Sequence, residues 1–168
     1  MTGTITAVCT SANKGPKAVV DGITLRKHHG ILGDAHAGQW HRQVSLLAEV
    51  HIAAMREHIP GLELGAFGEN IVIRDLAPEK LAVGQHLQVG PTVVLRITQI
   101  GKDCHRPCAI YHRVGHCIMP QYGTFAEVLT SGEIHSGDTA VALQSPLAVP
   151  RTFAPEGPVV QANRATHP

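Results

Sequence analysis

The sequence predicts a mostly β fold of the α+β type: a single barrel-like β domain with one main helix and short peripheral helices. Apolar residues fall in short runs that are rich in β-branched side chains and bounded by Gly or Pro, which is typical of strands. Only residues 48–59 combine good helix formers over a long stretch, and a Pro-Gly pair ends that stretch. With 168 residues, the chain is long enough for one domain with a substantial core.

The predicted elements follow one another with turn-rich loops between them. The predicted strands are residues 4–9, 19–25, 43–47, 71–73, 85–89, 93–100 and 139–143. Residues 48–59 are predicted as the main helix, and residues 125–129 as a short one. So many short strands with so few helices favour a barrel.

The composition changes after residue 144. Four prolines lie between Pro146 and Pro158, and the polar residues around them show no periodicity. We therefore expect one domain over residues 1–144 and a flexible, Pro-rich C-terminal tail over residues 145–168.

Charge and hydropathy argue against several classes of partner. The chain has 14 Lys and Arg residues against 13 Asp and Glu residues, so no broad basic field favours nucleic acid. The first residues show neither a basic leader nor an apolar signal segment, and no apolar run approaches the roughly 20 residues of a membrane helix. We expect a cytoplasmic protein with neither a nucleic-acid nor a membrane partner.

The chemistry concentrates between Lys102 and Cys117, where three cysteines and three histidines share one loop. Thiols stay reduced in the cytoplasm, so clustered cysteines there indicate metal binding or reactivity rather than disulfides. Lys102, Arg106 and Arg113 flank the cysteines, and neighbouring cations lower a thiol pKa from about 8.5. We therefore expect thiolates, which can carry sulfur as a persulfide, attack an electrophile or bind a soft metal.

Three interpretations of this cluster stay open at this point. Cys104, Cys108 and Cys117 with one histidine would form a tetrahedral zinc site, although the spacing lacks paired close-spaced cysteines. Alternatively, one cysteine is a reactive or cofactor-binding thiol. The cysteines can also be small core hydrophobes, the role we expect for Cys9 inside an apolar strand.

Polar residues in two glycine-rich loops are further candidates. Asp34 and His36 lie two apart, so both face one side of an extended chain; His36 would donate to a ligand and Asp34 would orient it. Arg42 opens a strand and would hold a phosphate or pterin oxygen through its planar guanidinium. Each residue can equally stabilise its own turn or face solvent.

Another four residues are candidates for holding a pterin or its phosphate. Glu69 and Asn70 follow Gly68 and would hydrogen-bond a pterin edge, although a simple turn explains them as well. Lys102 and Arg106 flank the thiols and suit a phosphate-bearing ligand, or they form a solvated basic loop.

The order of these motifs resembles the MOSC domain, which forms the C-terminus of molybdenum-cofactor sulfurases and also occurs as small stand-alone proteins. The resemblance covers roughly residues 3–143. The matching segments are residues 30–38 (GILGDAHAG), 42–47 (RQVSLL), 65–71 (GAFGENI), 81–90 (LAVGQHLQVG), 97–108 (ITQIGKDCHRPC) and 123–129 (GTFAEVL). It implies a β-barrel-like fold that binds or sulfurates the molybdenum cofactor (molybdopterin), or carries sulfur for metal-sulfur chemistry.

The resemblance also suggests roles for individual cysteines. Arg106-Pro107-Cys108 looks like the Pro-Cys of the small bacterial members, which makes Cys108 the principal thiol. Cys104 and Cys117 are additions to that pattern; Cys104 would resolve a persulfide on Cys108 as a disulfide. Pyridoxal phosphate belongs to a separate domain of the fused sulfurases, so we do not expect it here.

The resemblance leaves the activity open between a sulfur transferase and a molybdenum-dependent catalytic component. A sulfur carrier would need a donor such as a desulfurase, and a molybdoenzyme or a cofactor-biosynthesis protein as acceptor. A small molybdenum-dependent oxidoreductase would need a partner as electron donor, because the sequence has no recognisable nicotinamide, flavin or iron-sulfur motif. The alternative from another class is a zinc-binding module.

Overall fold

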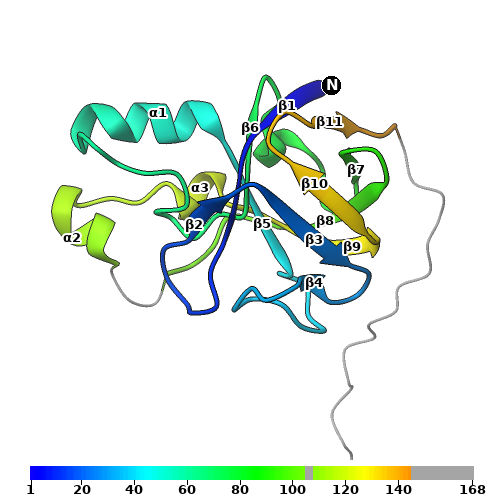
Figure 1. Cartoon of the computed structure of the whole chain (residues 1–168). Coiled ribbons are helices and arrows are strands. Elements are labelled where there is room, and N and C mark those ends of the chain that lie inside the picture. The colour runs from blue at the N-terminus through cyan, green and yellow to red at the C-terminus, as the bar shows by residue number, and fades with distance from the viewer. Residues whose placement is uncertain (105–107, 145–168) are drawn as a thin grey trace, which may run out of the picture.

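A computed structural model describes residues 1–104 and 108–144 (Figure 1). The predicted tail, residues 145–168, lies outside the described residues. The elements in chain order are β1 (Thr2–Thr10), β2 (Ala18–Val20), β3 (Gly22–Arg26), β4 (Gly30–Ile31), β5 (Val44–Ala48), α1 (Glu49–His58), β6 (Ile71–Arg74), the 3-10 helix η1 (Pro78–Lys80), β7 (His86–Val89), β8 (Val93–Ile100), α2 (Ala109–Val114), α3 (Met119–Tyr122), β9 (Thr124–Thr130), β10 (Gly132–His135) and β11 (Thr139–Ala142).

Seven of the strands close into a barrel, as the sequence predicts. Their order is β11-β7-β8-β9-β5-β6-β1, and pairing of β1 with β11 completes the circle. All neighbours in the barrel are antiparallel except β5 and β6, in which Leu46 lies opposite Ile71. The antiparallel strand β2 pairs with the far end of β1 and lies outside the closed ring.

A small second sheet and the helices cover the barrel on different sides. Strands β10, β3 and β4 form the small antiparallel sheet, which lies in front of the barrel in Figure 1, while α1 and α2 lie to its left. Among the described residues, no helix is long and apolar enough to cross a membrane.

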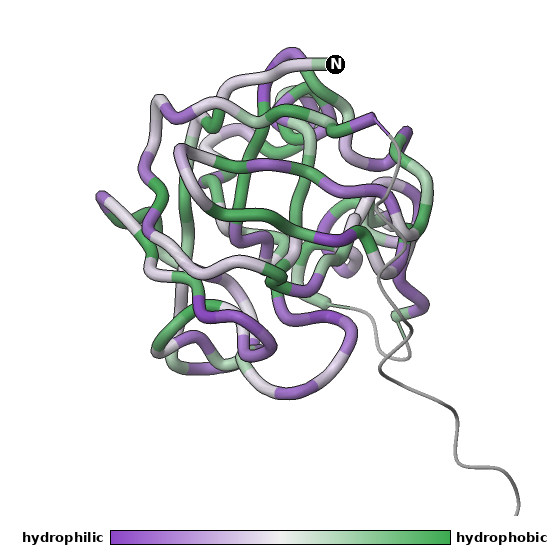
Figure 2. Tube along the Cα trace, turned by 90° about the vertical axis from the view of Figure 1, so that its right-hand side faces the viewer, coloured by the Kyte–Doolittle hydropathy of each residue, from purple (hydrophilic) through white to green (hydrophobic). Residues whose placement is uncertain are grey.

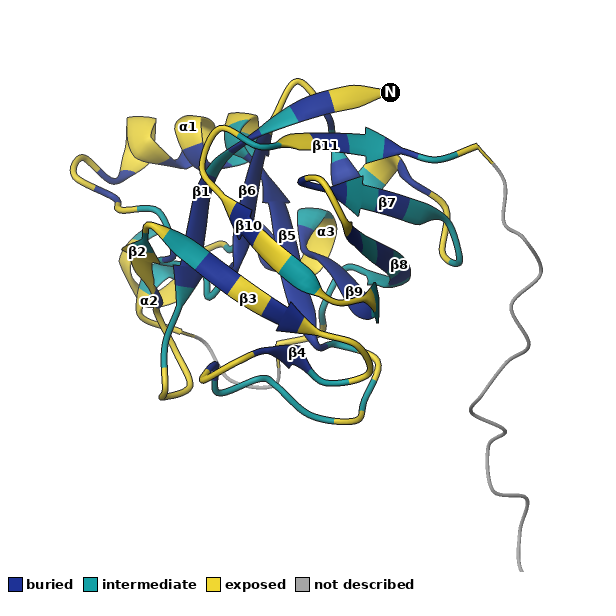
Figure 3. Ribbon diagram, turned by 45° about the vertical axis from the view of Figure 1, so that its right-hand side comes forward, coloured by how far each residue is buried: buried dark blue, intermediate teal, exposed yellow. Residues whose placement is uncertain are grey.

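The apolar residues form two cores, one on each side of the barrel wall. Val8 of β1 points into the barrel core, whereas its neighbours Ala7 and Cys9 pack in a second core beneath the helices. This follows from the alternation of side chains along a strand. Strands β5 and β6 are buried over almost their whole length because both of their faces are covered (Figure 3). Hydrophobic residues accordingly follow the strands, and hydrophilic ones gather in the loops (Figure 2).

Two expectations about individual elements are wrong. Residues 125–129 are not a helix but the centre of β9, which pairs with β5 on one edge and with β8 on the other. Pairing and burial there outweigh the helix propensity of Ala126, Glu127 and Leu129. Residues 19–25 are not one strand, because the chain changes direction at Asp21 and enters the small sheet as β3.

Candidate functional site

One cavity of about 710 Å³ brings together most of the residues that the sequence singles out. Cys104, Cys108 and Cys117 line it. Residues from the loops around β4, β5 and β6, which are far from the cysteines in the sequence, also line it. From these loops and from the segment after β8 come His36, Arg42, Asn70 and Lys102. Arg106 lies outside the described residues.

The three thiols lie close together but in unequal surroundings. Cys104 and Cys108 are exposed, and Cys108 immediately precedes α2. Cys117 is half-buried, and burial raises the pKa of its thiol above the usual value; a backbone hydrogen bond at Met119 opposes this rise. Negative charge on Cys108 and Cys104 and a side-chain hydrogen bond with Cys108 raise the Cys117 pKa further. Cys117 therefore forms a thiolate less readily than an ordinary thiol.

The residues that the structure describes do not assemble the predicted zinc site. Within residues 1–104 and 108–144, no group of three or more His, Cys, Asp or Glu side chains is arranged to hold a metal ion. The combination of Cys104, Cys108 and Cys117 with one histidine therefore remains a prediction.

The ammonium group of Lys17 contacts both Asp34 and His36. Asp34 does not line the cavity; its buried carboxylate forms an ion pair with the ammonium group of Lys17, and neither side chain is exposed. The same Lys17 Nζ lies 3.2 Å from His36 Nδ1, while Asp34 Oδ1 lies 3.9 Å from that ring nitrogen. Asp34 is thus linked to His36 through Lys17 and also approaches it directly at the longer distance.

Asn70 joins this ion pair to the barrel. Its amide nitrogen donates to the backbone oxygen of Cys9 (3.0 Å) and to Asp34 Oδ2 (3.2 Å). Its amide oxygen accepts from the backbone N–H of Ser45 at 3.1 Å. Both ends of the Asn70 amide are therefore used to hold β1, β5 and the Asp34 loop together at the cavity wall.

Glu69 is buried and does not line the cavity. Its carboxylate is fully buried and accepts hydrogen bonds from the backbone N–H groups of Gly65 (2.6 Å) and Phe67 (3.0 Å). Burial raises the pKa of this carboxyl, and the backbone hydrogen bonds and Lys17 oppose the rise. The visible role of Glu69 is to order the turn that carries Gly68.

Arg42 has the features of a ligand-binding cation. Its guanidinium lies over the rings of Trp40 (5.0 Å to the centroid) and Phe125 (5.6 Å), so its position is fixed. Arg42 Nε is buried and has no hydrogen-bond partner among the described residues. An unpaired buried donor costs about 1–3 kcal/mol, which an acceptor oxygen of a ligand would relieve.

Sequence reasoning did not find Lys17, the residue that links Asp34 to His36. Its neighbour Lys14 is exposed and Lys17 is buried, but the local sequence does not distinguish them. The preceding Gly-Pro turn marks only a loop. The burial of Lys17 depends on Asp34, 17 residues further along the chain.

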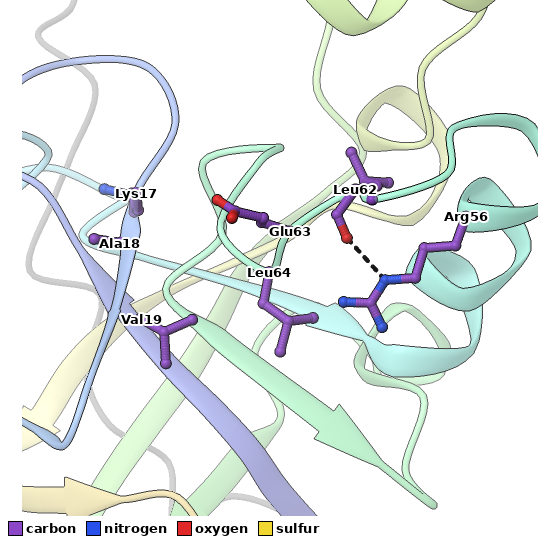
Figure 4. A pocket seen from close by; sticks show the side chains of 8 residues that line it. Lys17, Ala18, Val19, Arg56, Leu62, Glu63 and Leu64 are labelled. Carbon is purple, nitrogen blue, oxygen red and sulfur yellow. Dashed lines mark hydrogen bonds between the residues drawn. The ribbon is translucent and has the colours of Figure 1, made fainter.

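A second cavity, of about 580 Å³, lies between β2 and the loop that follows α1 (Figure 4). Arg56 lines it and donates from Nε to the backbone oxygen of Leu62 at 2.8 Å. None of its lining residues is a cysteine or a histidine. The thiol chemistry therefore belongs to the larger cavity.

Comparison with known proteins connects the chain to one family. The profile of the MOSC domain matches residues 33–141, well over half of the chain. A protein named reductase from Gibberella moniliformis is 28% identical over 143 residues, which are 75% of this chain and 25% of that protein. The chain thus spans about a quarter of the length of this curated relative.

Solved structures share the fold at low sequence identity. The YuaD protein from Bacillus subtilis is 16% identical with a TM-score of 0.69, over 83% of this chain and 94% of that chain. YiiM from Geobacillus stearothermophilus is 17% identical with a TM-score of 0.62, over 84% of this chain and 75% of that chain. YiiM from Escherichia coli is 17% identical with a TM-score of 0.63, over 89% of this chain and 73% of that chain.

The unequal surroundings of the cysteines predict an order of alkylation. With iodoacetamide at about pH 7, the exposed Cys104 and Cys108 should react several-fold faster than Cys117, whose raised pKa reduces its thiolate fraction. The rate at Cys117 should keep rising above about pH 8.5, where an ordinary thiol is half ionised. Cys9 should stay unmodified until the protein unfolds, because burial raises its pKa to about 12. Peptide mass spectrometry measures all four rates, and equal rates at Cys117 and Cys104 would contradict this description.

Proposed function

Because this chain belongs to the MOSC domain family, we propose that its larger cavity binds the molybdenum cofactor and that Cys108 is the principal thiol there. The observation that carries the proposal is the convergence of sequence-distant residues on one cavity. Three cysteines line this cavity together with His36, Arg42 and Asn70. A volume of about 710 Å³ falls within the roughly 300–1,000 Å³ of cofactor sites.

The donors in the cavity fit the cofactor. Arg42 carries a buried, unpaired N–H and a fixed guanidinium, which suits a phosphate or pterin oxygen. Lys102 lines the same cavity and adds a positive charge. When bound, the cofactor would supply a molybdenum centre that can accept sulfur or change its oxidation state, and soft thiolates are suitable ligands for it.

In the sulfur-carrier form of the proposal, Cys108 carries sulfur as a persulfide. Cys104 would resolve it: the Cys104 thiolate attacks the Cys108 sulfur, the two cysteines form a disulfide, and the outer sulfur leaves as hydrosulfide. Both cysteines are exposed at the cavity, so a sulfur donor such as a desulfurase has access to them. A molybdoenzyme or a cofactor-biosynthesis protein would be the acceptor.

A second candidate is the catalytic component of a reductase. It is favoured by the match to a protein named reductase, of which this chain covers only 25%. Under this proposal the thiol of Cys108 binds the cofactor, and a separate protein supplies the electrons. Zinc binding by the cysteine cluster remains the alternative outside molybdenum chemistry.

Replacing Arg42 tests the cofactor site. Arg42→Met keeps an unbranched apolar side chain but removes the charged donor that lies over Trp40 and Phe125. We expect about 10- to 100-fold weaker cofactor binding, since a hydrogen bond to a charged group contributes about 1.5–3 kcal/mol. The measurement is molybdenum and pterin content per protein after purification from a molybdenum-replete host.

Arg56→Met is the matched control. It removes the same charge from the second cavity, so pterin content should stay at the wild-type level. Equal loss in both variants, or full retention in Arg42→Met, would contradict a cofactor site at Arg42.

Cys108→Ala separates the two candidate functions. If the protein carries sulfur, wild type exposed to a desulfurase and cysteine should release about one thiocyanate per chain with cyanide, and Cys108→Ala should release almost none. Cys9→Ala is the control, because that buried thiol should not be loaded. Cyanide-releasable sulfur that persists in Cys108→Ala would remove Cys108 from the carrier role. Wild type that binds pterin but releases no sulfur would favour the reductase component.

A further inference from the structure

Lys17 is a buried cation for which neither the cofactor nor the thiols account. Its side chain is fully buried, and it does not line the larger cavity through which the proposed ligand would bind. Burying a lysine is costly unless its charge is paired and its donors are used. The partners of Lys17 therefore indicate what it does.

The ammonium group divides its donors between two residues. It lies within hydrogen-bond distance of both carboxylate oxygens of Asp34 and 3.2 Å from His36 Nδ1. An ammonium group has three donors and no acceptor. His36 Nδ1 must therefore present a lone pair to Lys17, and in neutral imidazole the ring proton then resides on Nε2.

The orientation of the His36 ring is fixed by a second set of contacts. Trp40 lies nearly parallel to it, with an interplanar angle of 13° and ring centroids 6.4 Å apart. Trp40 Nε1 also donates to the backbone oxygen of His36 at 2.7 Å. His36 lines the cavity and Lys17 does not, so the Nε2 edge is the one available to a ligand.

Burial and the neighbouring lysines disfavour the charged form of the His36 ring. Burial lowers the pKa of His36 most, the charge of Lys17 lowers it further, and Lys102 and Lys14 add to the effect. Asp34 opposes them by raising the His36 pKa, but its carboxylate is shared with Lys17. A neutral ring with a single N–H has a defined donor edge, whereas a charged ring would donate from both nitrogens.

We propose that Lys17 is a positioning residue that fixes His36 as the Nε2–H tautomer, so that His36 donates a hydrogen bond into the cavity. The ligand group at this point must then be an acceptor, such as a phosphate, pterin or metal-bound oxygen. Its identity as part of the molybdenum cofactor rests on the proposed function. The tautomer itself does not, because it is a property of the protein without ligand.

The test is ¹⁵N NMR of histidine-labelled protein without cofactor, which reports the protonation of each ring nitrogen. In wild type, His36 should show a protonated Nε2 and an unprotonated Nδ1. Lys17→Met alone leaves the Asp34 carboxylate buried without its partner, so the fold is at risk. The double variant Lys17→Met/Asp34→Leu removes both charges and puts apolar side chains in their place. In this variant, His36 should populate both tautomers.

Lys14→Met is the matched control, since it removes a lysine that also affects His36 but makes no hydrogen bond to it in the structure. Its His36 tautomer should equal that of wild type. A wild-type ring protonated on Nδ1, or an unchanged tautomer in the double variant, would overturn the proposal.

Cofactor content of the same proteins, purified from a molybdenum-replete host, provides the second readout. It should fall about tenfold in the double variant, the effect of one lost hydrogen bond. Wild-type protein that shows the Nε2–H tautomer but contains no pterin would refute the proposed function and leave the role of Lys17 intact. Full cofactor content in the double variant, with mixed tautomers, would refute the positioning role.

Discussion

The buried ion pair between Lys17 and Asp34 is the interaction on which the site depends. Removing two charges from water costs several kcal/mol per ion, so the pair is tolerable only with further hydrogen bonds. Asn70 supplies one to Asp34, and His36 accepts one from Lys17. The backbone of Lys17 also contacts the loop between α1 and β6, because its N–H donates to the backbone oxygen of Gly65 at 2.9 Å. A side chain at Gly65 would meet the Lys17 oxygen at 2.1 Å, so this close approach requires glycine.

The barrel explains why loops so distant in the sequence converge at this pair. Strands β5 and β6 run parallel in its wall, so the loops that precede them, with Arg42 and Glu69, open at the same end. Strand β9 is antiparallel to β5, so the thiol segment between β8 and β9 joins the barrel at the other end of β5. Cys117 and Met119 of this segment pack in the second core, outside the barrel, and line the cavity from there. The cavity is thus bounded by loops whose ends are fixed in paired strands, which positions the donors before any ligand arrives.

Much of this arrangement could be predicted from the sequence, and the failures share one cause. The β-branched runs predicted the barrel, and the motif order predicted the family. Several of the residues that the sequence singles out also line one cavity. Three features were not predictable in this way: that residues 125–129 form a strand, that Cys117 is half-buried, and that Lys17 pairs with Asp34. Each feature depends on residues far away in the chain. Strand β9 forms because it pairs with β5, Cys117 is covered because it packs beneath the helices, and Lys17 is buried because it pairs with Asp34. Local propensity and spacing contain no information about such contacts.

Native mass spectrometry of protein from a molybdenum-replete host tests the central claim, that the thiol-lined cavity holds the molybdenum cofactor. We predict an added mass equal to molybdopterin with molybdenum, at about one copy per chain, which disappears when the protein is unfolded. A spectrum that shows only the bare polypeptide, or zinc in place of the pterin, would contradict the claim.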